Sequence, residues 1–422
     1  MAETRIVVIG AAGEMCRIAI ERFAAHHSGW SLDLYDLNED GLRELAAKLP
    51  PGRIRTGRVD LFNPVALREV IRDASLVILG AGPYIRTAHP VMQACIEAGV
   101  NYLDFDDDVE STQAAIELDA AAREAEIACF VGCGASPGMT NVMAADAAAQ
   151  LDVVHTLDVC WCTGDEGPHL YGAAVIEHLL HIAAGECVTW RDGQAATAPS
   201  FRDSGMFSMG GGVGDVRLYE CAHPEAVTLP RRFPEARSIR VMGGLDPQPV
   251  NGIARGIAQA VLAEKMSVAE AVAWFQEVMQ DKNGSLKGWR YALRGMLGQV
   301  RRRENSLPDM ARFLWAAARK QHPPFRGGLL AVATGVKDGE TTCVTRRSPL
   351  SGAGTYLWSS MGAATGTATA AFTSLALDDT GRRGVLFPED WVRPQDFYAA
   401  LGRVGVPAHE ITDHDFEPAA LA

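Results

Sequence analysis

The chain has 422 residues, of which 48% are hydrophobic and 22% charged, so it is long enough for two or three domains with buried cores. Its formal net charge of −13 argues against electrostatic binding to nucleic acid or to an anionic membrane. The apolar run near the N-terminus is too short for a signal peptide or a membrane span, so we expect a cytoplasmic protein.

Strands and helices alternate along the first third of the chain. We predict strands at residues 5–9, 31–35, 57–60, 75–79, 101–105 and 128–131, and helices at 14–26, 39–48, 64–73 and 88–98. This alternation predicts an α/β fold in which helices cover both faces of a parallel sheet, as in the doubly wound Rossmann fold. Ligands of such sheets bind beyond the carboxyl ends of the strands, so the residues that follow each strand are the candidates for a site.

The first strand ends in GAAGEMC, which is an incomplete dinucleotide-binding fingerprint. Gly10 would allow a tight turn, and Gly13 would let the chain pass close to a pyrophosphate held by the first amides of the next helix. The third position of the fingerprint packs the helix on the strand, and either Met15 or Cys16 would fill it. Taken alone, the loop also fits an ordinary strand-turn-helix.

Asp36 ends the second strand, 26 positions after Gly10. An acid at this point accepts hydrogen bonds from the adenosine ribose, whereas a 2′-phosphate would meet like-charge repulsion, and no arginine follows at Leu37 or Asn38. We therefore expect NAD rather than NADP; a helix-capping aspartate is the alternative. The residues predicted to contact the cofactor are Gly10, Ala12, Gly13, Glu14, Met15, Asp36, Leu37, Asp60, Gly80, Ala81, Gly82, Pro83 and Tyr84.

The fourth and fifth strands also end in residues that suit a site. The small residues 80–83 would let a cofactor lie against the backbone, and Tyr84 could cover the nicotinamide or simply pack in a turn. Asp104 and three further acids at 106–108 follow the fifth strand. The loop lacks the alternating ligands and turn glycine of a calcium site, so we expect one functional carboxylate, Asp104, with solvated or helix-capping acids beside it.

The second part of the chain has longer alternating strands and glycine-rich turns. Together with a mostly helical stretch over residues 255–320, they predict an α+β domain with a mixed or antiparallel sheet. Residues 327–347 predict a hairpin that turns at residues 337–339. Cys160 and Cys162 would share a strand face but lack further ligands for zinc, so we expect no metal site and buried free thiols among the nine cysteines.

Several longer stretches occur in a fixed order that is typical of one family. SLVILGAGPYIRTAHPVMQACIEAGVNYLDFDDD contains an apolar strand, a GP turn, an AC…AG helix and a YxD strand, and VGCGASPGMTNVMA follows it. GECVTWRDGQ, YECAHPEAVTLP, VATGVKDG and GVLFPEDWV come later. Together these stretches resemble the saccharopine dehydrogenase-like oxidoreductases. The chain differs from that family at Ala12 and Met15, where glycines are common, and at Ser136, where an aspartate is usual.

The resemblance implies a Rossmann domain, a substrate domain whose sheet often mediates dimerisation, and a C-terminal segment that returns to the Rossmann domain. We place these at residues 1–148, 149–359 and 360–422. It also implies a homodimer that uses NAD(P) to transfer hydride at a C–N bond of a small, amino-acid-like substrate. Two alternatives stay open: an NAD(P)-dependent reductase or dehydrogenase of a carbonyl or enoyl substrate, and a non-catalytic NAD-binding protein.

Hydride transfer at a C–N bond needs a group that manages the proton on nitrogen. Asp104, Tyr84 and His169 are the predicted catalytic residues, although a histidine in a polar loop is also explained by simple surface exposure. An arginine would be needed to bind a substrate carboxylate. The predicted substrate-binding residues are Ser136, Pro137, Gly138, Tyr171 and Arg202.

Overall fold

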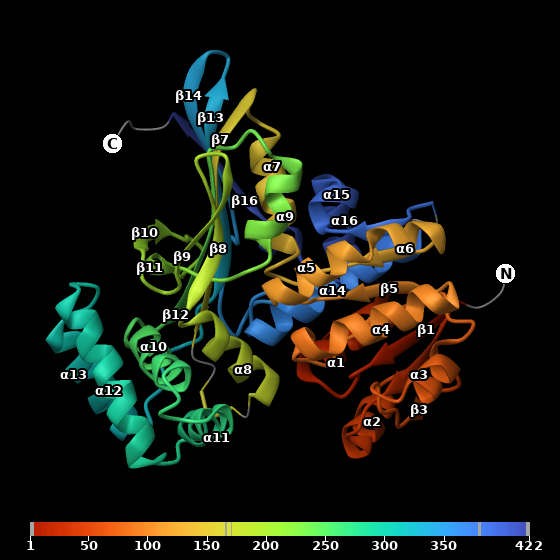
Figure 1. The fold of residues 1–422 in the computed structure, drawn as a ribbon, viewed down its shortest axis with the longest axis horizontal. Coiled ribbons are helices and arrows are strands. Elements are labelled where there is room, and N and C mark those ends of the chain that lie inside the picture. The colour runs from red at the N-terminus through yellow and green to blue at the C-terminus, as the bar shows by residue number, and fades with distance from the viewer. Residues whose placement is uncertain (1–3, 165–166, 170, 379–380, 419–422) are drawn as a thin grey trace. The chain divides into compact units, whose positions relative to one another are not determined.

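The computed structural model describes residues 4–164, 167–169, 171–378 and 381–418 (Figure 1). The chain divides into two compact units. Unit 1 comprises residues 1–149, 227–232 and 362–412, and unit 2 comprises residues 150–226, 233–361 and 413–422. Both units are therefore assembled from segments that lie far apart in the sequence.

Unit 1 is built on a parallel seven-stranded sheet with the order β15-β6-β5-β4-β1-β2-β3. Its strands are β1 (Thr4–Ile9), β2 (Trp30–Tyr35), β3 (Ile54–Gly57), β4 (Leu76–Leu79), β5 (Asn101–Asp104), β6 (Ala128–Phe130) and β15 (Gly384–Leu386). The apolar runs of β1 and β4 are buried on both faces of the sheet, which explains why their sequences are continuously hydrophobic and do not alternate with polar residues. The predicted doubly wound fold is confirmed, with its switch point between β1 and β4.

The helices of unit 1 follow these strands along the chain. They are α1 (Glu14–His26), α2 (Glu39–Ala46), α3 (Pro64–Ile71), α4 (Tyr84–Ala98), α5 (Val109–Glu117), α6 (Asp119–Glu124), α7 (Met139–Ala148), α14 (Met361–Asp378), α15 (Pro388–Trp391) and α16 (Pro394–Arg403), with a short 3-10 turn η1 (Ala408–Glu410). Small residues make α14 fit closely: a Cβ on Gly366 would lie 2.6 Å from the carbonyl oxygen of Met15 in α1. The C-terminal part of the chain is thus packed directly on the first helix.

Two elements of unit 1 differ from the prediction. The third strand covers Ile54–Gly57 rather than 57–60, because the Asp60 carboxylate accepts a hydrogen bond from Phe62 N (3.0 Å) and turns the chain there. Helix α4 begins at Tyr84, four residues before the predicted start, and contains Pro90. The side chain of Asp108 accepts a hydrogen bond from Ile85 N (3.0 Å), so a remote residue satisfies an amide of the first helical turn.

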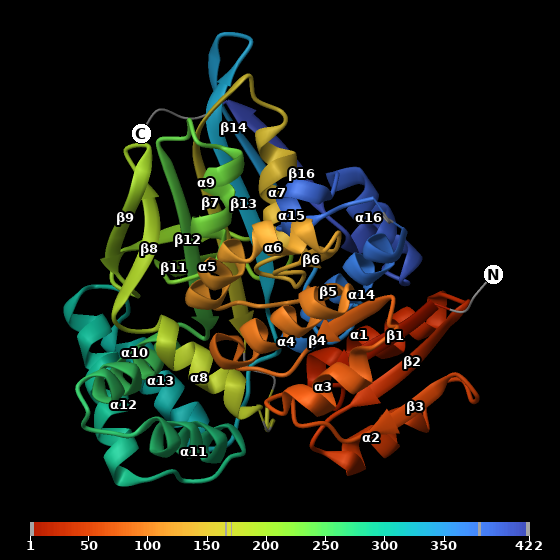
Figure 2. The same cartoon turned by 45° about the vertical axis from the view of Figure 1, so that its right-hand side comes forward.

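Unit 2 is built on a mixed nine-stranded sheet (Figure 2). Its strands are β7 (Val153–Gly164), β8 (Glu186–Arg191), β9 (Gln194–Pro199), β10 (Ser204–Ser208), β11 (Asp215–Glu220), β12 (Ser238–Asp246), β13 (Gly328–Lys337), β14 (Glu340–Arg347) and β16 (Asp413–Pro418). Strand β12 runs parallel to β7, and the other pairs are antiparallel. Strand β16 pairs with β14, so the chain leaves unit 1 after residue 412 instead of ending there.

The predicted hairpin is confirmed as β13 and β14. Asp338 and Gly339 form its two-residue turn with φ angles of 51° and 83°, as a type I′ turn requires. The helices of unit 2 are α8 (Ala173–Ile182), α10 (Pro249–Leu262), α11 (Val268–Met279), α12 (Leu286–Arg301) and α13 (Leu307–Ala318), and α9 (Glu225–Arg232) crosses from unit 2 into unit 1. No helix among the described residues is long and apolar enough to span a membrane.

Candidate cofactor-binding site

The loop after β1 lies directly against the loop after β4. Gly10 has a φ angle of +84°, and a Cβ there would lie 2.5 Å from Ala81 N, so neither the conformation nor the space admits a side chain. Its own N–H donates to the carbonyl oxygen of Tyr35 at the end of β2 (2.8 Å). The loop of residues 10–13 is therefore pinned between the ends of three neighbouring strands, with Gly13 at the N-terminus of α1.

Cys16 fills the third position of the glycine fingerprint. Its side chain is buried, and a Cβ added to Gly80 would lie 2.2 Å from the Cys16 sulfur atom, whereas Met15 is half-buried. Cys16, rather than Met15, therefore occupies the packing position at which the fingerprint usually has a glycine. Burial raises the pKa of this thiol to about 12, so it acts as a small apolar group. None of the nine cysteines forms a disulfide bond in the described structure, and eight of them are buried, as predicted.

Asp36 joins the end of β2 to the same loop. One carboxylate oxygen accepts a hydrogen bond from Ala12 N and the other from Asn38 N, each at 2.9 Å. The side chain is half-buried, and no lysine or arginine among the described residues forms an ion pair with it. Leu37, the next residue, is 63% exposed. A carboxylate therefore stands at the point where this fold binds the adenosine ribose.

The ring of Tyr84 is buried beside the end of β4. It is 6% exposed, its hydroxyl donates to the carbonyl oxygen of Leu79 (3.3 Å), and its ring meets Phe105 edge-on at 5.7 Å. Burial, followed by the charge of Asp104, raises its pKa well above the usual value. The contact of Tyr84 with a nicotinamide stays a prediction, because in this structure its hydroxyl donates a hydrogen bond to the backbone of β4.

Asp104 is a fully buried carboxylate at the end of β5. It accepts hydrogen bonds from the Tyr102 hydroxyl (2.7 Å), Gly132 N (2.8 Å) and Asp106 N (3.2 Å). Burial raises its pKa to about 6, against the lowering effect of these bonds. Burial and the neighbouring Asp104 raise the pKa of Asp106 further. The pKa values of two neighbouring carboxyl groups are thus raised by burial, which is a property of acid–base sites.

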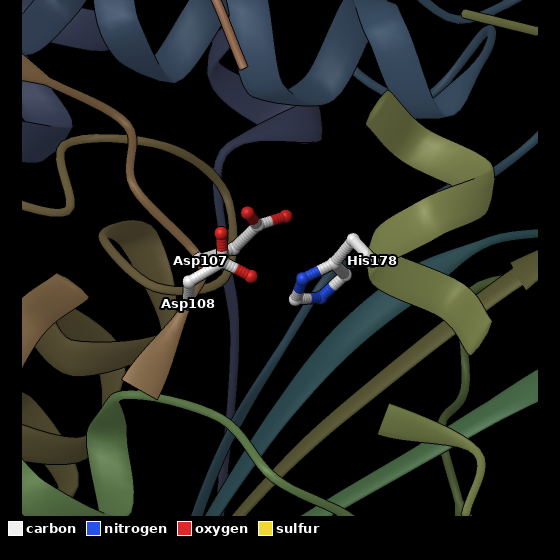
Figure 3. Close-up of side chains that lie close together, drawn as sticks. All are labelled: Asp107, Asp108 and His178. Atoms are coloured by element: carbon white, nitrogen blue, oxygen red, sulfur yellow. The ribbon is translucent and has the colours of Figure 1, made fainter. Parts of the chain in front are cut away.

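Asp107 and Asp108 follow Asp106 in the loop before α5, and Figure 3 shows their side chains. Asp108 precedes α5 and binds Ile85 N at the start of α4, as described above, while Asp107 is half-buried beside it. His178, also labelled in Figure 3, projects from α8 of unit 2. Within unit 2 the His178 ring meets that of His223 edge-on at 5.6 Å.

His223 and Glu225 form a buried pair in unit 2 that the sequence reasoning did not identify. The distance from His223 Nδ1 to a Glu225 carboxylate oxygen is 2.8 Å, and both residues are at most 4% exposed. The indole of Trp161 lies 5.9 Å from the His223 ring. The sequence HPE carries no recognised motif, and only the fold brings His178 and Trp161 to it.

The turn at residues 136–138 is held by a buried hydrogen-bond network. Gly138 has a φ angle of +124°, and its N–H donates to the side-chain oxygen of Asn141 (2.9 Å). The amide nitrogen of Asn141 donates to the Thr228 hydroxyl (3.1 Å) and to a Glu389 carboxylate oxygen (2.9 Å). Burial raises the pKa of Glu389 to about 7. The Asn141 side chain thus connects two remote segments of unit 1 to the predicted substrate turn at Ser136 and Pro137.

The remaining predicted catalytic and substrate-binding residues, His169, Tyr171 and Arg202, lie in unit 2. His169 and Tyr171 are adjacent, with ring centroids 4.7 Å apart, and the Tyr171 carbonyl oxygen accepts a hydrogen bond from the Gln276 side chain (3.0 Å). Arg202 is exposed after β9 and forms no ion pair with a described residue. No observed contact brings Arg202 to the two aromatic rings, so its role in substrate binding stays a prediction.

Comparison with known proteins identifies a matching domain family and several relatives. Residues 6–130 match the model of the saccharopine dehydrogenase NADP binding domain. Over 173 residues the chain is 27% identical to carboxyaminopropylagmatine dehydrogenase of Synechocystis sp., covering 39% of this chain and 43% of that protein. Over 145 residues it is 28% identical to the trans-acting enoyl reductase of Mycobacterium leprae, covering 33% and 35%. The matched segments thus span less than half the length of these curated relatives.

One solved structure is similar over nearly the whole chain. The saccharopine dehydrogenase (L-Glu forming) of Saccharomyces cerevisiae has a TM-score of 0.64 and 15% identity, covering 98% of this chain and 100% of that one. At this identity the likeness shows the fold alone. The resemblance to saccharopine dehydrogenase-like oxidoreductases is confirmed by these findings, and a nicotinamide dinucleotide is the cofactor class of the matched domain.

Proposed function

We propose that this protein is an NAD(P)-dependent oxidoreductase that transfers hydride between a nicotinamide cofactor and a C–N bond of an amino-acid-like substrate. The observation that carries the proposal is the tight loop of residues 10–13, whose amide at Ala12 is bound by the carboxylate of Asp36. The match of residues 6–130 to an NADP binding domain supports the cofactor class. Similarity to a dehydrogenase of carboxyaminopropylagmatine supports a substrate that carries an amine.

The residues around this loop fit a dinucleotide. The absence of a side chain at Gly13 leaves room for a pyrophosphate at the first amides of α1, and Asp36 would accept hydrogen bonds from the ribose. When bound, the cofactor supplies or takes up the hydride. The chain would bind and orient the two reactants, and Asp104 would hold or release a proton, because its pKa of about 6 lies close to neutral pH.

We further propose that NAD is preferred over NADP. A 2′-phosphate would approach the carboxylate of Asp36, and no cation among the described residues pairs with that carboxylate. Titration of the protein with NADH and NADPH tests the preference. Asp36→Ala should weaken NADH binding by about ten- to a hundredfold, because a charged acceptor of the ribose is lost, and should leave NADPH binding less affected.

Asp40→Ala is the matched control for this titration, since Asp40 is exposed and pairs with Arg43 of its own helix. It should leave the affinity for both dinucleotides unchanged. Equal losses of NADH and NADPH affinity in Asp36→Ala, or tighter binding of NADPH by the wild type, would contradict the preference for NAD.

The substrate class is tested by the change in nicotinamide absorbance with a panel of amines, alcohols and enones. Turnover confined to amines that also carry a carboxylate would support the proposal. The similarity to a trans-acting enoyl reductase favours a second candidate, reduction of a carbonyl or activated alkene on the same fold, and enone turnover would support it instead. Tight dinucleotide binding without any turnover in the panel would point to a non-catalytic protein.

A further inference from the structure

The outer face of α12 combines exposed leucines with cations. Its inner face packs on α10, where a Cβ on Gly295 would collide with the carbonyl oxygen of Gly252. The buried residues of the helix define that inner face; they are Gly288, Ala292, Gly295, Met296 and Gln299. Figures 1 and 2 both show α12 among the outer helices of unit 2. The residues on the opposite side of the helix therefore face away from the core of this unit.

Three leucines form a strip along this outer face. Leu286 is 89% exposed, Leu297 is 52% exposed and Leu293 is 37% exposed. With 3.6 residues per turn, their side chains lie within an arc of about 40° around the helix axis. We refer to these three residues as the leucine strip. Apolar side chains that line up at the surface in this way are typical of a site that binds another molecule or a membrane.

Four cations occupy the next arc of about 60° beside the leucine strip. They are Lys287, Arg290, Arg294 and Arg301, all exposed, and α12 contains no acidic residue. Lys287 pairs with Glu270, whereas the three arginines form no ion pair with a described residue. A helix whose apolar strip is bordered by Lys and Arg is typical of segments that lie in the interface of an anionic membrane.

The charge of the chain is concentrated around this helix. Residues 286–320 contain nine Lys and Arg but two Asp and Glu, so the formal charge of this segment is +7. The rest of the chain must carry −20 to give the net charge of −13. The net charge argues against a membrane for the chain as a whole, but it averages over this one basic segment. An anionic surface would attract the segment and repel the rest, so it would orient the protein with α12 towards it.

The next helix of the basic segment carries a residue that is common at membrane surfaces. Trp315 of α13 is 56% exposed, and the guanidinium of Arg319 lies 3.7 Å from the centre of its ring. Tryptophan is enriched at the level of the lipid headgroups, where its ring contacts both hydrocarbon and water.

We propose that α12 binds the surface of a membrane that contains anionic lipids. The leucine strip would insert between the headgroups, and the three arginines would bind the lipid phosphates. A bilayer accommodates leucines and arginines together without a groove of matching shape, so we favour it over an acidic protein as the partner. This inference does not depend on the proposed hydride transfer.

Sedimentation of the full chain with sucrose-loaded vesicles tests the proposal. We expect binding to phosphatidylcholine mixed with phosphatidylserine but not to phosphatidylcholine alone, and weaker binding as the salt concentration rises. Arg290→Gln combined with Arg294→Gln should weaken binding by about tenfold or more, because each cation near an anionic bilayer adds to the affinity. Arg232→Gln combined with Arg237→Gln removes the same charge at exposed positions outside the basic segment and should bind like the wild type.

A second pair of substitutions tests the leucine strip. Leu286→Gln combined with Leu297→Gln keeps every charge and should also weaken binding by about tenfold or more, because two leucines no longer enter the bilayer. Both leucines are exposed and glutamine is a good helix former. We therefore expect circular dichroism to show that all three double variants melt like the wild type.

Three results would overturn the proposal. The first is a wild type that stays in the supernatant with phosphatidylserine vesicles, and the second is equal sedimentation with phosphatidylcholine alone. The third is a leucine variant that binds vesicles as tightly as the wild type. If the wild type and the leucine variant also bound polyglutamate with the same affinity, the arginines would be assigned to an acidic polypeptide instead.

Discussion

Replacement of Glu389 by glutamine tests the buried network that connects three remote segments of unit 1. The residue is 6% exposed, and one carboxylate oxygen accepts a hydrogen bond from the Asn141 amide (2.9 Å). Within the described residues the other oxygen has no hydrogen-bond partner. Burial raises its pKa from 4.5 to about 7. Glutamine keeps the size and an acceptor oxygen but carries no charge.

The sign of the effect on stability follows from the two pKa values. Below about pH 4.5 the carboxyl is protonated in the folded and unfolded states, so it does not oppose folding. As the pH rises toward 7, the unfolded chain releases the proton while the folded protein keeps it, and the free energy of unfolding falls. Above about pH 7 the loss is complete at about 3 kcal/mol, since each unit of pKa difference is worth about 1.4 kcal/mol.

Urea unfolding of the wild type and Glu389→Gln between about pH 6 and pH 8 measures this loss. About 1.4 kcal/mol of it falls within this range, which also avoids precipitation near the isoelectric point of about 5.3. We expect the variant to lose less stability than the wild type as the pH rises, and to be the more stable protein at pH 8. Glu44→Gln, at an exposed position of α2, should follow the wild type. If the free energy of unfolding changed with pH by the same amount in the wild type and in Glu389→Gln, the raised pKa of Glu389 would be refuted.

Two further predictions concern the candidate site. Gly10→Ala should cost about 1–3 kcal/mol of stability and abolish NADH binding, because the new Cβ would lie 2.5 Å from Ala81 N at a φ angle of +84°. Thermal unfolding and NADH titration measure both effects; an equal destabilisation by Gly52→Ala, which has a positive φ and open space, would show that the collision is unimportant. Tyr102→Phe removes a hydroxyl that favours ionised Asp104, so the pKa of that carboxyl should rise above about 6. Carboxyl-carbon NMR titration measures this shift, and an unchanged value would show that the hydrogen bond is weak.

The strands of unit 1 could be predicted because buried parallel strands are short, continuous apolar runs bounded by turn residues. The edge strand β15 could not, since three residues carry too little pattern and its partner β6 lies more than 250 positions earlier. The start of α4 was missed for a similar reason. The carboxylate of Asp108 accepts a hydrogen bond from the amide of Ile85, and a contact between residues this far apart cannot be predicted from the local sequence around α4.

The candidate cofactor site was predictable to the extent that its chemistry is local. Gly10 and Asp36 directly follow the ends of β1 and β2. In a parallel sheet of this fold, the carboxyl ends of the strands lie at the same edge, where ligands bind. The network of Asn141 and the pair of His223 and Glu225 were not identified, because each depends on partners from several segments. Buried polar residues of this kind have no sequence signature until the tertiary contacts are known.

The division of the chain between its units constrains how the protein can be synthesised and dissected. Unit 1 takes residues from three stretches, and its last strand and final helices lie after residue 361. On the ribosome its sheet therefore cannot be completed until almost all of the chain has emerged. Until then, β6 in the first third of the chain lacks its partner β15 and is an unpaired edge strand. A fragment that ends near residue 149 would keep that edge unpaired. We expect such a fragment to aggregate. To express the two units separately, the sequence segments of each unit would have to be joined to one another, because no single cut in the chain separates them.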